Sequence, residues 1–199
     1  MSAHESMEHA EHAEHATHSN RNIALLIAII ALFLALSEML GKGAQTESIA
    51  RNVEASNLWA FFQAKSIRRT QIQTAAEQGR LTFAATSDEA AKAALAKQIE
   101  TWEKTAARYR SEPETGEGTE QLAKRAKEAE HARDEATDKY HHYEYASAMF
   151  QIAIVLASAT IITGMIWLAW ASGLLMLGGI VMTWAGLFWP HLLHALHLH

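Results

Sequence analysis

The sequence predicts an all-α membrane protein, with three transmembrane helices and a soluble, coiled-coil-like helical section between the first and the second. After Glu144 the chain runs to His199 without Asp, Glu, Lys or Arg, and residues 22–37 are equally free of charge. About 20 apolar residues are needed to cross a bilayer core of roughly 30 Å, so residues 23–40 supply one crossing and residues 146–189 supply two. We therefore expect an integral membrane protein that has the lipid bilayer as a partner.

The charged residues support the same division, because sixteen of the seventeen Lys and Arg lie between Lys42 and Lys139. Seventeen Asp and Glu lie between Glu47 and Glu144, so the middle section is densely charged and nearly neutral, as soluble helices are. The predicted sections are a His/Glu-rich tail (1–21), a transmembrane helix (22–41), a soluble helical stalk (42–145), two further transmembrane helices (146–171 and 172–190) and a His-rich C-terminal tail (191–199).

The N-terminal tail places four histidines at steps of three: His9, His12, His15 and His18. Residues three apart share a helix face and neutral imidazole is the commonest metal-ligand side chain, so a pair of them with a nearby Glu could bind zinc, nickel or copper. The alternative is a solvated, pH-responsive tail without metal. A second cluster closes the chain, where interspersed leucines favour an amphipathic interfacial helix: His191, His194, His197 and His199.

The first apolar block has no small-residue cleavage pattern after it, which favours a retained anchor over a cleaved signal peptide. Gly41 and Gly43 flank Lys42 at the expected water boundary and could act as a swivel before a soluble helix over residues 45–78. This helix carries an aromatic cluster, Trp59, Phe61 and Phe62. We expect the cluster to contact other helices or another subunit; the alternative is docking on the membrane surface, with Lys65, Arg68 and Arg69 facing headgroups.

Two further soluble helices are predicted. Thr86 and Glu89 form a capping box that would begin the second, and Pro113 with Gly116 and Gly118 would end it. The third begins near Thr119 and carries an apolar or small residue every seventh position: Leu122, Ala129, Ala136, Tyr143 and Phe150. This repeat continues into the second apolar block, so we expect one helix that passes unbroken from water into lipid and packs closely along an alanine-rich seam.

Within the apolar blocks, Glu38 is the single ionisable residue, and such residues are functional hypotheses by default because they are costly in lipid. Gln151 lies a similar distance into the second span from the same side, so the two side chains could hydrogen-bond and anchor the bundle. The alternative is an ion or proton role, with Glu38 of several copies forming a ring at a pore mouth. Small residues mark helix-packing faces in the last two spans, with a turn expected near residues 171–173.

Orientation follows from the basic residues near the spans. Lys42 and Arg51 flank one end of the first span and only Arg21 flanks the other. The positive-inside bias therefore favours a cytoplasmic middle section. Three crossings then place the N-terminal tail outside and the C-terminal tail inside.

Several classes of function are excluded or disfavoured. The chain has no cysteine, which rules out disulfides, thiolate catalysis and Cys-based metal centres. No basic excess marks a nucleic-acid-binding face. There is no phosphate-binding loop, nucleophile elbow or His-Glu-x-x-His motif, so we expect neither an enzyme nor a required cofactor.

Two segments resemble a known family: Ala-Leu-Ser-Glu-Met-Leu-Gly-Lys at 35–42 and Asn-Val-Glu-Ala-Ser-Asn-Leu-Trp-Ala-Phe-Phe-Gln-Ala-Lys at 52–65. With the His-Glu-rich start and the paired C-terminal spans, the whole chain resembles the uncharacterised bacterial membrane proteins of domain of unknown function 4337. The resemblance implies this topology and a multi-pass location in the bacterial inner membrane. It implies no site residues, because the family has no assigned activity.

The expected function is a non-enzymatic, oligomeric inner-membrane protein that serves as a scaffold or docking surface, with a protein partner of unknown identity. The alternative is an ion channel or a metal-handling membrane protein that uses Glu38 and the His-rich tails.

Overall fold

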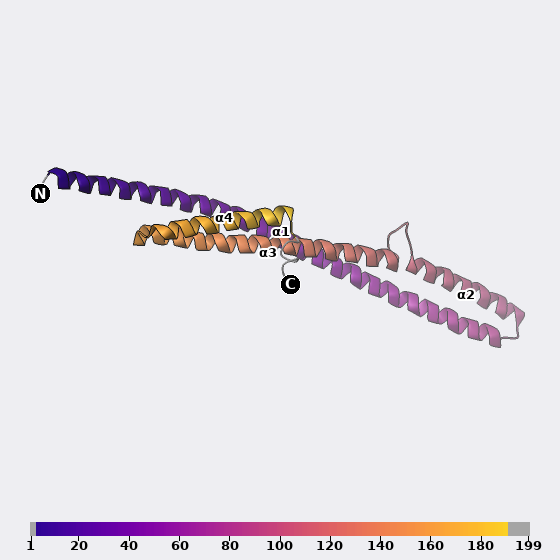
Figure 1. Cartoon of the computed structure of the whole chain (residues 1–199). Coiled ribbons are helices and arrows are strands. Elements are labelled where there is room, and N and C mark those ends of the chain that lie inside the picture. Colours follow the sequence, from indigo (N-terminus) through magenta and orange to yellow (C-terminus); the bar gives the residue numbers. More distant parts are fainter. Residues whose placement is uncertain (1–2, 191–199) are drawn as a thin grey trace. The chain divides into compact units, whose positions relative to one another are not determined.

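The computed structural model describes the backbone of residues 3–190 and the side chains of residues 21–190. Over this part of the chain it contains four α-helices and no strand: α1 (Ala3–Ala85), α2 (Glu89–Arg110), α3 (Thr119–Thr163) and α4 (Ile166–Phe188) (Figure 1). Three of them, α1, α3 and α4, are long and apolar enough to cross a membrane. The predicted all-α class with three membrane-spanning helices is confirmed.

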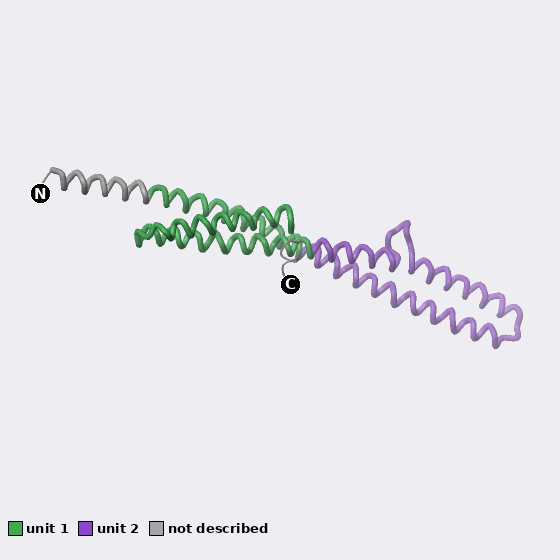
Figure 2. The backbone as a smooth tube through the Cα atoms, viewed as in Figure 1, with its two compact units in different colours: residues 1–48, 134–199 green, residues 49–133 purple. Residues whose placement is uncertain are grey.

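The chain divides into two compact units, coloured green and purple in Figure 2. Unit 1 combines residues 1–48 with 134–199, and unit 2 comprises residues 49–133. Residues 42–48 and 134–145, which the sequence assigned to the soluble stalk, therefore belong to the same unit as the spans. Both α1 and α3 contribute residues to both units.

Unit 1 is built around Phe150 of α3, whose side chain is completely buried. It packs with Ile30 of α1 and with Ala146 and Ala153, and its ring stacks on Phe33 with 6.0 Å between the ring centroids. Many large apolar side chains of unit 1 are exposed, for example Ile162 of α3 and Trp170 and Leu174 of α4. An apolar outer surface around a packed core is what a lipid environment requires.

Unit 2 contains a second buried cluster: Ala55 and Leu58 of α1 with Leu122, Ala126 and Ala129 of α3. The α2 helix packs antiparallel to the end of α1, where Gly79 brings the two helices together. A Cβ atom there would lie 3.1 Å from both Ile99 and Trp102.

The seven-residue repeat of α3 is buried throughout, and α3 runs unbroken from Thr119 to Thr163 as predicted. The partners of the repeat lie in the same chain. Leu122 and Ala129 pack against α1 in unit 2, and Phe150 packs against α1 and α4 in unit 1. The repeat therefore offers no free seam to a second copy.

Two predicted helix boundaries of the stalk are wrong. The α1 helix continues through Gly41 and Gly43 to Ala85, so the chain has no helix break or swivel at these glycines. Gly41 is buried, and a Cβ there would lie 3.4 Å from the Cβ of Tyr143, so the residue allows close helix packing. The α2 helix is capped by Asp88, which accepts a hydrogen bond from the Ala90 N–H at 3.0 Å. The hydroxyl of Thr86 donates instead to the Thr82 carbonyl of α1.

The predicted turn between the last two spans is also misplaced. It lies between Thr163 and Ile166, not near residues 171–173. Gly164 has φ +71° and its N–H donates to the Thr160 carbonyl, an arrangement that ends a helix and favours glycine. Ser172 lies inside α4, where its hydroxyl donates to the Ala153 carbonyl of α3 at 2.7 Å. The Ser172 hydroxyl, expected in a turn, thus links α4 to α3.

Candidate functional site

A groove of about 450 Å³ lies between α1 and α3 in unit 1. We name it the boundary groove, because it lies where the sequences of α1 and α3 change from charged to apolar. Glu38, Lys42 and Gln45 line it from α1, at steps of four and three residues; Glu144, Ser147 and Gln151 line it from α3 with the same kind of spacing. Such spacing places the side chains of each helix on one face.

Glu38 and Gln151, which the sequence paired, both lie in the boundary groove. Both side chains are exposed, and no hydrogen bond joins them among the interactions of the described residues. Glu144 is the second carboxylate of the groove and was not among the residues predicted from the sequence. Glu144 contacts His141 Nδ1 and the Tyr140 hydroxyl, each at 3.4 Å. The seven-residue interval between Glu144 and Gln151 was the signal that could have revealed it.

The boundary groove offers two carboxylates, one ammonium group and several hydroxyl or amide groups to a polar molecule. In the part of the chain that the structure describes, no three His, Cys, Asp or Glu side chains gather as a metal site would require. The metal prediction for His9, His12, His15 and His18 and for the C-terminal histidines concerns side chains outside the described part, so it stays a prediction.

Of the three predicted interaction residues, Trp59 and Phe62 pack within the chain. Both lie against the buried cluster of unit 2, and their rings meet edge to face with centroids 5.4 Å apart. The Trp59 indole N–H donates to Glu130 of α3 at 2.9 Å. Phe61 is 41% exposed and remains available to a partner.

Lys65 is buried, which contradicts the alternative in which it faces lipid headgroups. Its ammonium group lies 3.1 Å from Glu112 and 3.6 Å from Glu117, and 5.6 and 5.7 Å from the ring centroids of Phe61 and Tyr109. The hydrogen bond from Lys65 holds the pKa of the Glu112 carboxyl below its usual value. Lys65 thus fixes the loop after α2 to α1.

His142 is another buried polar residue, and no sequence pattern had indicated it. Its Nδ1 contacts the Asp138 carbonyl at 2.9 Å, and its Nε2 has no hydrogen-bond partner among the described residues. Its Cβ would lie only 2.8 Å from a Cβ at Gly186 of α4, so the imidazole belongs to the packing of α3 against α4.

One face of α1 in unit 2 is exposed and carries no charge at the positions that repeat every seven residues. These positions, named here the outer face, are Val53, Ala60, Ile67, Thr74 and Leu81. Ile67 is 59% and Leu81 is 74% exposed. The outer face lies opposite the side of α1 that carries Ala55 and Leu58. These residues follow Val53 by two and five positions, and side chains at these intervals point in nearly opposite directions from an α-helix. The repeat is present in the sequence, but its residues are too mixed in polarity to mark it as a helix face by composition alone.

Comparison with known proteins matches residues 19–189 to a family described as Domain of unknown function (DUF4337). The resemblance that the sequence suggested is confirmed. No curated protein and no solved structure matches the chain.

Proposed function

The chain belongs to the DUF4337 family, and we propose that it is a non-enzymatic, oligomeric scaffold of the bacterial inner membrane. Unit 2 would present a helical docking surface, and the spans of unit 1 would hold it at the membrane. The observation that carries the proposal is the outer face of α1.

The outer face suits a second copy of the same helix. The five positions recur at intervals of seven residues, as one of the two core positions of each heptad does in a parallel coiled coil. Two identical outer faces would meet without like charges at Val53, Ala60, Ile67, Thr74 or Leu81. Burying the exposed aliphatic side chains would contribute roughly 25 cal/mol for each Å² of apolar surface removed from water.

Anchoring in the membrane also favours association of two copies through the outer face. The spans of two copies would share one bilayer and one orientation, so their α1 helices would meet parallel and in the same register. Confinement to one membrane also raises the effective concentration of the second helix, which favours association without any new contact.

We expect Ile67→Glu to weaken self-association, because it places a charge at the centre of the proposed seam. The matched control is Gln98→Glu, which adds the same charge to an exposed position of α2. Mass measurement of the purified protein in mild detergent should show a larger species for the unmutated chain and for Gln98→Glu, and a shift toward monomer for Ile67→Glu.

The absence of cysteine allows a second measurement in native membranes. A single Ile67→Cys should form a covalent dimer on oxidation, since equivalent seam positions of parallel helices face each other, whereas Gln98→Cys should not. A clean monomer at all concentrations, with no crosslink at position 67, would contradict the scaffold proposal. It would also contradict a pore lined by Glu38, because only several copies can multiply Glu38 into a ring of carboxylates.

That alternative is supported by the boundary groove, where Glu38 and Glu144 lie on facing helices. The groove also contains the ammonium group of Lys42, which would oppose cation entry. We therefore rank ion or metal handling second to the scaffold.

We propose a cytoplasmic position for the section between the first and second spans, on the distribution of Lys and Arg. Reporter fusions at Gly116 and at the C-terminus should both give a cytoplasmic signal. A single cysteine at Ser6 should react only with reagents that reach the periplasm. A periplasmic signal at Gly116 would reverse the orientation, and disagreement between Gly116 and the C-terminus would contradict the three crossings.

A further inference from the structure

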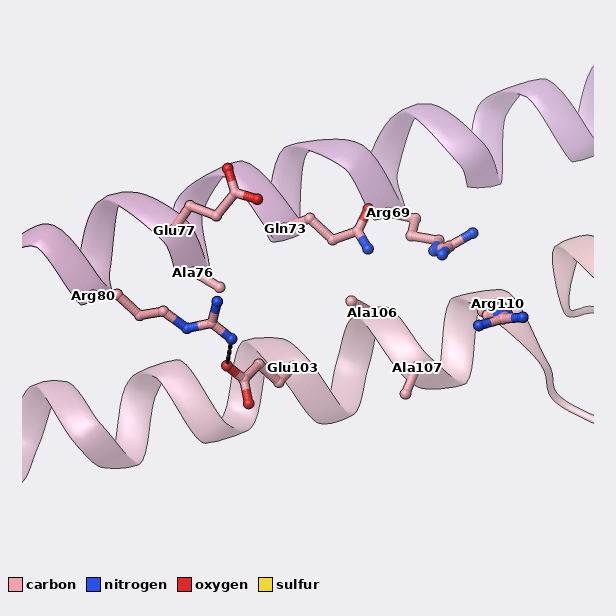
Figure 3. A pocket seen from close by; sticks show the side chains of 9 residues that line it. All are labelled: Arg69, Gln73, Ala76, Glu77, Arg80, Glu103, Ala106, Ala107 and Arg110. Atoms are coloured by element: carbon pink, nitrogen blue, oxygen red, sulfur yellow. Dashed lines mark hydrogen bonds and ion pairs between the residues drawn. The ribbon is translucent and has the colours of Figure 1, made fainter.

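A cavity of about 300 Å³ lies between α1 and α2 in unit 2, and three arginines line it: Arg69 and Arg80 from α1 and Arg110 from α2 (Figure 3). We name it the arginine cavity. Its floor is formed by small side chains, among them Ala76 and Ala106, which are buried. Small residues at these positions leave room between the helices that larger side chains would fill.

The three arginines differ in how their charge is compensated. Arg80 forms an ion pair with Glu103 across the cavity, and Arg110 donates to Glu120 at 2.8 Å. Among the described residues, Arg69 forms no ion pair, and its buried Nε–H has no hydrogen-bond partner. A buried donor without an acceptor is costly and rare in native proteins.

The charges that line the cavity favour an anion. Figure 3 shows Arg69 and Arg110 at the same end of the cavity, one on each helix, with the side chain of Gln73 beside Arg69. The carboxylate of Glu77 points away from α2 in the same view. Two cations that line one cavity from different helices are stabilised by an anionic acceptor placed between them.

We propose that the arginine cavity binds a small, soluble phosphate-containing anion, with Arg69 as its principal ligand and Arg110 and Gln73 as further donors. The planar guanidinium group presents paired N–H donors that match two oxygens of a phosphate. The Nε–H of Arg69 would gain the acceptor that it lacks in the chain itself.

Glu120 acts as an internal competitor for the same cations. The hydrogen bond from Arg110, and to a smaller extent the charge of Arg69, holds the pKa of the Glu120 carboxyl below its usual value. Glu120 therefore stays ionised near neutral pH and occupies part of the positive potential that an incoming phosphate would use. Removing its charge should strengthen phosphate binding.

The test is calorimetric titration of the full chain in detergent with inorganic phosphate and with pyrophosphate, at constant ionic strength. Arg69→Gln should lower the affinity about tenfold or more, the effect expected for losing hydrogen bonds to a charged group. Arg68→Gln is the matched control, since it removes the same charge from the neighbouring, exposed position outside the cavity, and should leave the affinity within about twofold. Glu120→Gln should raise the affinity.

Circular dichroism and thermal unfolding of each variant show whether the helices persist. If Arg69→Gln does not fold, Arg69→Lys takes its place, because it keeps the charge but loses the paired donors and should still weaken binding. Equal losses for Arg68→Gln and Arg69→Gln would overturn the proposal in favour of unspecific charge attraction. Absence of binding for both phosphate and pyrophosphate at millimolar concentration would overturn the anion-site proposal outright. Neither this result nor equal losses in the two variants would contradict the scaffold proposal, which rests on the outer face.

Discussion

Gly179→Leu in α4 should destabilise the packing of the spans by about 3 kcal/mol, the upper part of the usual range for overpacking. A Cβ atom at Gly179 would lie 2.6 Å from Cε1 of Phe150. The Phe150 ring cannot give way easily, because it is completely buried and stacks on Phe33. The loss should appear as a lower midpoint of thermal unfolding in detergent.

Gly173→Leu provides the control in the same helix, since a Cβ there would meet nothing within 4 Å. It makes the same change of residue without the clash and should shift the midpoint far less. Combining Gly179→Leu with Phe150→Ala should recover part of the loss, because the smaller side chain makes room. Equal effects of the two leucine variants, or no recovery in the double variant, would show that α4 does not pack on Phe150 as described.

The class of fold could be predicted from the sequence because it depends on long patterns. Charge-free blocks locate the spans without knowledge of their tertiary contacts. The seven-residue repeat of α3 identifies buried positions by spacing alone. The boundaries were less predictable because single hydrogen bonds decide them. Thr86 bonds to the carbonyl four residues earlier in α1 instead of capping α2. Ser172 bonds to the Ala153 carbonyl of α3, a partner that only the folded chain supplies.

The candidate sites divide in the same way. Glu38 and Gln151 could be placed in one groove because both lie about one turn inside their apolar blocks. The burial of Lys65 could not be predicted, since it depends on Glu112 and Glu117, which lie about 50 residues later in a loop. The arginine cavity depends likewise on the register between α1 and α2, which Gly79 and the alanines set.

Leu122→Ala should destabilise unit 2 by about 2 to 5 kcal/mol, the range for removing a large buried aliphatic side chain. Leu122 is completely buried where α3 meets Ala55 and Leu58 of α1. Hydrogen exchange of the full chain, measured by mass spectrometry, should show faster exchange in peptides that cover residues 55–62 and 122–129. The acceleration should reach roughly 30-fold or more, because each 1.4 kcal/mol corresponds to a factor of ten.

Leu95→Ala is the matched control, because Leu95 lies in α2 at the edge of unit 2 and is only half-buried. It should accelerate exchange in residues 55–62 much less than Leu122→Ala does. The spans provide an internal reference: peptides around Phe150 belong to the separate core of unit 1 and should keep their protection in both variants. Equal acceleration around Phe150 and around Leu58 would mean that the two clusters open together, which would contradict a scaffold whose docking unit and membrane unit have independent cores.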